Sequence, residues 1–101
     1  MNQQQLMREA RKLQEQLAKI QEDLGNESVV GSAGSGAVEV TLNGHGNVQR
    51  IKVDPAAVDP EDVGTLEDLI LIAFKDAQAK VAALSQSRMG PLAGGLGIPG
   101  L

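Results

Sequence analysis

The chain has 101 residues, the size of one domain, and its nine Lys and Arg stand against 13 Asp and Glu, for a net charge of −4 at pH 7. The absence of cysteine excludes disulfides and thiolate sites, and no apolar run is long enough for a membrane span or a signal peptide, so we expect a cytoplasmic protein. Of the residues 42% are hydrophobic but Phe74 is the single aromatic one, and so thin an aliphatic core favours association of chains.

The first predicted element is a helix over residues 3–24. Its apolar residues recur at alternating spacings of four and three, the a/d pattern of a helix that packs along one seam. Gly25 and Asn26 then predict the C-terminal stop. The seam consists of Leu6, Ala10, Leu13, Leu17, Ile20 and Leu24.

Residues 28–53 change to the period of two that is typical of strands. A weak strand over 28–33 and a Gly-rich turn precede 37–42, where Val38, Val40 and Leu42 alternate with polar residues. Residues 43–46, Asn-Gly-His-Gly, predict a hairpin turn before a third strand over 47–53. Val48 is out of register with the apolar residues of that strand, which predicts a bulge or an edge contact. An antiparallel sheet with one apolar face needs a helix to cover it.

The second long helix is predicted from the stretch after Asp54-Pro55, which ends the third strand and leads into one short helical turn over 55–58. Asp59 is the expected N-cap and Pro60 the first helical residue, and the helix runs to about Arg88. Residues 91–101 hold four glycines and two prolines, so we expect a domain over 1–89 and a flexible tail over 90–101 that is not helical.

This second helix carries more apolar surface than one face. A broad stripe is expected to pack on the sheet, whereas Leu71 and Ile72 fall outside it. Because a short chain cannot cover both sides, we expect a second copy to cover the remainder, with Leu69, Leu71 and Ile72 at the dimer interface. The stripe consists of Val63, Leu66, Leu69, Ile70, Ala73, Phe74, Ala77, Val81 and Leu84.

Three features that resemble ligand or catalytic sites have simpler explanations. The glycines of residues 31–36 join two strands, whereas a phosphate loop joins a strand to a helix. His45 is the single histidine and lies at a turn, where solvation is the expected state, and the acids at 59–62 are accounted for by helix capping. We therefore expect no enzyme, no cofactor, no metal site and no small-molecule substrate.

The basic residues are the remaining candidates for a binding site. Helices of about 22 and about 26 residues span roughly 33 and 39 Å, whereas a seven-residue strand covers roughly 23 Å. Both helices are therefore expected to overhang the sheet as arms, with cations on or near the arm ends, although charge alone fits a solvated surface helix equally well.

Several segments in order along the chain resemble the YbaB/EbfC family of bacterial nucleoid-associated proteins. The resemblance rests on Gly31-Ser-Ala-Gly-Ser-Gly-Ala-Val38, Asn43-Gly-His-Gly46, Val53-Asp-Pro55, Asp59-Pro-Glu-Asp62, Leu66-Glu-Asp-Leu-Ile70 and the closing Met89-Gly-Pro-Leu-Ala-Gly-Gly-Leu-Gly-Ile-Pro-Gly-Leu101. It covers essentially the whole chain.

The resemblance implies an α+β fold. Its subunit is α-β-β-β-α, with a three-stranded antiparallel sheet flanked by two long helices, and two subunits form a tweezer-like homodimer with protruding helical arms. It also implies binding of double-stranded DNA with limited sequence preference, alteration of DNA conformation, and roles in nucleoid organisation and gene regulation. The family's DNA contacts carry over to Arg8, Arg11, Lys12, Lys19, Lys80 and Arg88.

An acidic middle segment and a pI of about 4.8 predict modest, salt-sensitive DNA affinity. The alternative function is a protein-interaction scaffold that uses the helical seams to bind a partner protein.

Overall fold

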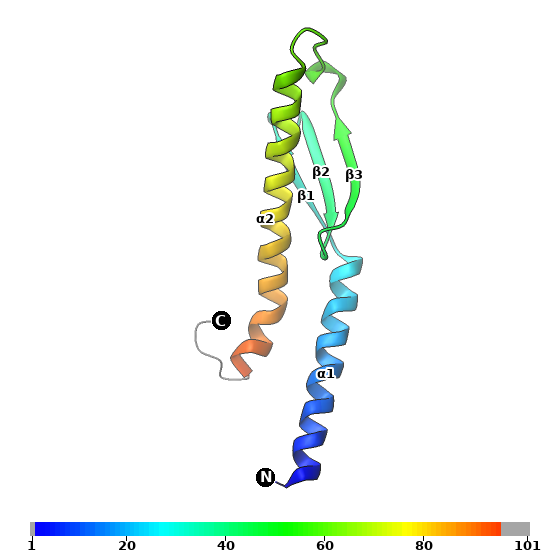
Figure 1. Ribbon diagram of the computed structural model, residues 1–101, viewed down its shortest axis with the longest axis vertical. Coiled ribbons are helices and arrows are strands. Elements are labelled where there is room, and N and C mark those ends of the chain that lie inside the picture. Colours follow the sequence, from blue (N-terminus) through cyan, green and yellow to red (C-terminus); the bar gives the residue numbers. More distant parts are fainter. Residues whose placement is uncertain (1, 96–101) are drawn as a thin grey trace.

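The computed structural model describes residues 2–95 and has the predicted α-β-β-β-α order (Figure 1). The elements are α1 (Gln3–Asn26), β1 (Ser28–Ala33), β2 (Val38–Asn43), β3 (Val48–Val53), the 3-10 turn η1 (Pro55–Ala57) and α2 (Val63–Gly95). The molecule is elongated, with extents of 71 × 25 × 16 Å. Its length arises because α1 runs away from the sheet instead of along it, so that one end of the molecule is helical only (Figure 1).

Helix α1 is held at its start by a capping box. The Asn2 side chain accepts a hydrogen bond from the Gln5 backbone N–H at 2.8 Å, and the Gln5 side chain accepts one from the Asn2 backbone N–H at 3.3 Å. The helix ends at Asn26, two residues beyond the predicted end. Within α1 only Leu24 is buried, so the other seam residues are at most half-buried in the subunit.

The sheet has strand order β1-β2-β3, antiparallel throughout. Val38 pairs with Val53 and Val40 with Ile51, which places all four on one face, as the alternation predicts. The register then shifts so that Leu42 pairs with Val48. This irregularity confirms the bulge that the out-of-register valine predicts, and it bends β3 away from a regular ladder.

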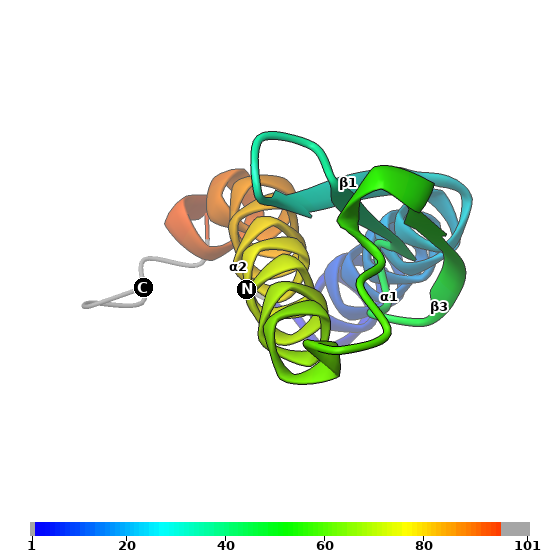
Figure 2. The same cartoon turned by 90° about the horizontal axis from the view of Figure 1, so that it is seen from above.

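Helix α2 covers β1 and β2, and Figure 2 shows it lying along one side of the sheet. Ala73 and Ala77 are fully buried, and a Cβ at Gly31 would collide with the backbone of both. The small residues let helix and strand backbones approach closely. The core consists of Ala33, Val38, Val40, Leu42, Ala73 and Ala77, with Val29, Leu66, Leu69, Ile70, Phe74 and Val81 packed against it.

Both ends of α2 differ from the prediction. The Asp59 side chain accepts a hydrogen bond from the Glu61 backbone N–H at 3.0 Å, which makes a turn, and the helix begins only at Val63. Asp62 replaces Asp59 at the helix start, because its carboxylate accepts bonds from the backbone N–H of Thr65 at 3.4 Å and from its hydroxyl at 2.6 Å.

At the other end α2 continues past Arg88 to Gly95, so the first part of the predicted non-helical tail is helical and that prediction is wrong for residues 90–95. Leu92 is half-buried and lines a groove that faces α1, so the helix continues through Gly90 and Pro91 in spite of their poor helix propensity. The predicted tail residues 96–101 lie outside the described residues. Within residues 2–95, no helix is long and apolar enough to cross a membrane.

Candidate nucleic-acid interface

The N-terminal part of α1, residues 3–20, projects from the sheet and is called the arm below (Figure 1). Arg8, Arg11 and Lys12 are all exposed on it. At about 100° per residue Arg8 and Arg11 fall on the face opposite the apolar seam, whereas Lys12 and Lys19 lie at the side of the helix, on the rim of the groove between α1 and α2. The arm therefore carries a cationic stripe that runs from its solvent-facing side to the groove rim, and its leucines face α2.

These four arm cations differ in their partners. Lys19 forms an i,i+4 ion pair with Asp23 at 3.8 Å, and both side chains are more than half exposed. In the described part of the chain, Arg8, Arg11 and Lys12 take part in no ion pair. Because an exposed i,i+4 pair is weak, Lys19 remains available to a stronger anion, and the other three are available outright.

Lys80 does not lie near an arm end, where the sequence places it. Its ammonium donates a hydrogen bond to the Val30 carbonyl at 2.7 Å and pairs with Asp76 at 3.3 Å. Asp76 in turn accepts a hydrogen bond from the Ser32 backbone N–H at 3.0 Å. Val30 and Ser32 belong to the edge strand β1, so the two side chains occupy backbone groups along its open edge.

The pKa of Asp76 lies below its ordinary value of 3.8. The largest cause is the hydrogen bond from the Ser32 backbone N–H, and the hydrogen bond from Lys80 adds to it, because both favour the charged carboxylate. Both members of the Asp76–Lys80 pair are therefore hydrogen-bonded to the backbone of β1. In this structure the Lys80 ammonium therefore binds the edge strand of the sheet.

Arg88 is likewise engaged within the subunit. Its guanidinium makes two hydrogen bonds to the Glu27 carboxylate, one from Nη2 to Oε1 and one from Nε to Oε2, the latter at 3.2 Å. Glu27 joins α1 to β1, so the pair ties the overhanging half of α2 to the base of α1. Bidentate pairing of this kind fixes orientation as well as charge.

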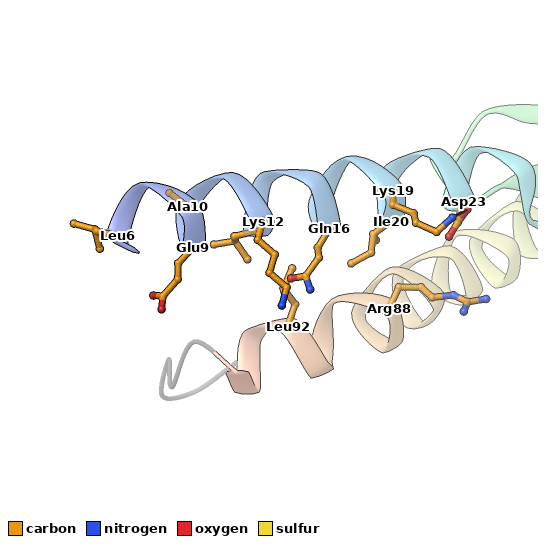
Figure 3. A pocket seen from close by; sticks show the side chains of 11 residues that line it. Leu6, Glu9, Ala10, Lys12, Gln16, Lys19, Ile20, Asp23, Arg88 and Leu92 are labelled. Carbon is orange, nitrogen blue, oxygen red and sulfur yellow. Dashed lines mark ion pairs between the residues drawn. The ribbon is translucent and has the colours of Figure 1, made fainter. Parts of the chain in front are cut away.

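A groove of about 870 Å³ separates the arm from the overhanging half of α2 (Figure 3). Leu13 and Ile20 of the seam line it from one side and Leu92 from the other. Figure 3 shows Lys12 reaching toward α2 beside Gln16, so the rim of this apolar groove is polar. The groove leaves the arm seam half covered.

His45 has a partner that sequence reasoning missed. The sequence predicts a solvated side chain, and His45 is exposed, but its Nε2 donates a hydrogen bond to the Gln21 carbonyl of α1 at 2.7 Å. The adjacent Gly44 N–H donates to the Leu24 carbonyl at 2.9 Å. The sequence holds a weak signal for this contact, since β1 starts where α1 ends and a hairpin brings the end of β2 beside that start, but the pairing itself requires the fold.

The three residues expected at a dimer interface lie in two environments. Leu69 packs against the core beside the β1–β2 turn, so it already has cover within the subunit. Leu71 and Ile72 are each 53% exposed, as their positions outside the stripe predict. On β3, Ile51 faces the same side as the core valines and yet is 47% exposed, because α2 covers β1 and β2 instead.

Comparison with known proteins agrees with this arrangement. The model of the YbaB/EbfC DNA-binding family matches residues 1–96. A nucleoid-associated protein of Roseiflexus sp. (strain RS-1) is 50% identical over 100 residues, which is 99% of each chain. One of Mycobacterium sp. (strain KMS) is 50% identical over 99 residues, 95% of this chain and 90% of that protein.

Among solved structures, an uncharacterised protein of Helicobacter pylori has the same fold, with a TM-score of 0.74 at 20% identity over 95% of this chain and 98% of that one. The sequence relatives extend over nearly the full length, and the family model spans all six structural elements. The chain belongs to the YbaB/EbfC DNA-binding family.

Proposed function

We propose that this protein binds double-stranded DNA as a homodimer and that the cationic stripe of the arm makes the principal contacts. The observation that carries the proposal is that Arg8, Arg11 and Lys12 are exposed, lie on one half of the arm's circumference and have no ion-pair partner among the described residues. Lys19 adds a fourth cation after release from Asp23. Lys80 and Arg88 contribute less, because both bind acidic partners within the subunit.

Contacts of this kind recognise phosphate and not bases. Long, exposed Lys and Arg side chains neutralise the DNA backbone, which gives limited sequence preference and strong dependence on salt. The chain has one aromatic residue, so stacking on bases contributes nothing substantial. Two arms that grip one duplex would alter its conformation, and with relatives named nucleoid-associated proteins we place the protein in the nucleoid, with effects on its organisation and on gene expression.

The homodimer is supported by apolar surface that the subunit leaves uncovered. Helix α2 leaves the face of β3 uncovered, and α2 itself carries apolar residues outside the stripe that packs on the sheet, so both elements present aliphatic side chains to solvent. Burial of such surface contributes about 25 cal/mol per Å², and a chain of 101 residues with an aliphatic core has little other stabilisation in reserve. The exposed residues are Val48, Ile51, Val63, Leu71 and Ile72.

The DNA proposal is tested by a titration across salt concentration with a charge-removal variant. Replacement of Arg8, Arg11 and Lys12 by Ala removes six of the eight stripe cations from the dimer, so we expect the slope of log K against log salt to change from about −7 to about −2, the value for the two Lys19 side chains that remain. Fluorescence anisotropy with a labelled duplex measures both slope and affinity.

The matched control is the double variant Arg50→Ala and Lys52→Ala. Both residues are exposed cations on β3, away from the arm, and we expect their removal to change the affinity by less than threefold. If the control variant loses as much affinity as the arm variant, the binding follows overall charge and the assignment to the arm is wrong.

A second candidate function, a scaffold for a partner protein, is favoured by the groove between the arm and α2. Its apolar lining suits an amphipathic helix. Leu13→Glu places a charge in that groove without touching the cationic stripe. Retained DNA binding together with loss of a stoichiometric partner from a pull-down would support the scaffold, whereas loss of neither would dismiss it.

A further inference from the structure

We infer that the turn between β2 and β3 sets the direction of the arm, and that His45 is a positioning residue for the cationic stripe. This inference rests on the proposed function for its consequence in DNA binding, but its structural content is independent of DNA. The turn over residues 43–46 lies against the last turn of α1 and contacts it through both backbone and side chain.

Backbone hydrogen bonds hold the base of α1 to the turn. The Gly44 N–H donates to the Leu24 carbonyl at 2.9 Å and to the Glu27 carbonyl at 3.0 Å. A Cβ at Gly44 would collide with the Leu24 carbonyl, so only glycine allows this approach. Leu24, at 2% exposure, is the buried residue of the helix. The base of α1 is therefore fixed to the turn at one point.

The His45 side chain provides a second contact, which prevents rotation of α1 about that point. The His45 Nε2–H donates to the Gln21 carbonyl, one helical turn nearer the arm tip than Leu24. The imidazole also lies over Gly25, where an added Cβ would be 3.1 Å from Cε1. Two anchors a turn apart define a direction, whereas one anchor does not.

The Asn43 side chain fixes the shape of the turn. The Asn43 side-chain oxygen accepts hydrogen bonds from the backbone N–H of His45 at 2.9 Å and of Asn47 at 3.0 Å. These bonds hold the His45 backbone in place, so the imidazole projects from a fixed frame toward α1. An asparagine at the first position of the turn thus contributes to the placement of a helix.

A small change in the direction of α1 at its base moves the arm tip by a larger distance. The arm tip near Gln4 lies 17 residues from Gln21, or roughly 26 Å at 1.5 Å per residue. A change of about ten degrees at the base would move the tip by roughly 4 Å, far more than the half-ångström range of a good hydrogen bond. The groove beside the arm is open, so packing against α2 does not replace the anchor.

The test measures arm direction without DNA. The chain has no cysteine, so spin labels can be placed at Gln4→Cys on the arm and Lys52→Cys on the sheet, with excess unlabelled chain present so that only distances within one subunit are recorded. We expect His45→Ala to shift or broaden the distance distribution by several ångströms. His45→Gln, whose amide Nε2–H can donate in the same place, should restore the original distribution.

Asn47→Ala is the matched control, because Asn47 directly follows the turn and has no side-chain contact to α1 among the bonds of the described residues. It should leave the distances unchanged. A His45→Ala distribution that superimposes on that of the unsubstituted protein would overturn the inference.

The DNA affinity gives an independent readout. His45→Ala should weaken binding several-fold and His45→Gln by less than twofold. If neither the unsubstituted protein nor any variant binds DNA, the proposed function is wrong. The distance measurement still decides the role of His45 in that case.

Discussion

At the scale of single residues, the smallest side chains decide how closely the helices approach the sheet. Gly31 lies in the middle of β1, where a Cβ would meet the backbone of Ala73 and Ala77. Gly44 does the same at the base of α1. Both glycines are buried. The close approach brings the large aliphatic residues of α2 into contact with β2, so the absence of a side chain at one position supports burial at several others.

We expect Gly31→Ala to destabilise the fold by about 1–3 kcal/mol, because α2 must move off β1 to admit the methyl group. Urea unfolding measures the free energy. Gly64→Ala is the control, since it lies in α2 with open space around its Cβ and should stabilise by up to about 1 kcal/mol through helix propensity. Equal effects at the two positions would contradict the close approach.

Asp76 gives a residue-scale prediction for pH. Its pKa is lowered in the folded state, so its contribution to stability is present above the ordinary value of 3.8 and is lost as the pH falls through the lowered pKa. Asp76→Asn keeps an acceptor but cannot titrate. The stability difference between the two proteins should therefore be constant from pH 7 to pH 5 and shrink below pH 3.8. A constant difference throughout would show that the carboxylate charge contributes nothing.

At the scale of elements, the two edges of the sheet are treated differently. Edge strands present unpaired backbone groups that can pair with other chains. On β1, the Asp76–Lys80 pair occupies the Val30 carbonyl and the Ser32 N–H. On β3, by contrast, every residue except Val53 is exposed. Helix α2 thus protects one edge and leaves the other strand open, which is consistent with association through the β3 side.

Lys80→Met tests this protection. The methionine keeps the apolar stem of the side chain but removes the ammonium, so we expect lower stability and more self-association at β1. Sedimentation at rising protein concentration should show species larger than those of the unsubstituted protein. DNA affinity should change by less than threefold; a loss as large as that of the arm variant would instead place Lys80 among the DNA contacts.

At the scale of the whole molecule, one end holds the sheet and the other holds only helices (Figure 1). Extents of 71 × 25 × 16 Å give a large surface for few residues, and much of it is aliphatic. A dimer would bury the apolar side of the sheet end and leave two cationic arms projecting. The division between an associating end and a binding end follows from where the uncovered apolar residues and the unpaired cations lie.

We expect the double variant Leu71→Glu and Ile72→Glu to dissociate the dimer, because each side chain is half exposed in the subunit and its charge would be buried on association. Light scattering should give the mass of one chain in place of two. Val58→Glu is the control, as an equally exposed apolar residue in a loop. A monomeric mass for the unsubstituted protein would contradict the homodimer.

The sequence by itself determined the elements and the faces they present. Periodicity depends on local geometry, so the three strands, the inward valines, the bulge near Val48 and the stripe of α2 could all be predicted. The resemblance in motif order identified the family for the same reason, since it needs no contact between distant residues.

The tertiary structure alone decided which polar groups meet. Lys80, Arg88 and His45 read as free surface residues in the sequence, and each contacts a group brought near only by folding, at Val30, Glu27 and Gln21. The end of α2 also lies beyond the predicted one: the helix continues through Gly90 and Pro91, and Leu92 lines the groove that faces α1. Helix and strand patterns are properties of neighbouring residues, whereas hydrogen-bond partners and helix ends depend on packing between segments far apart in the chain.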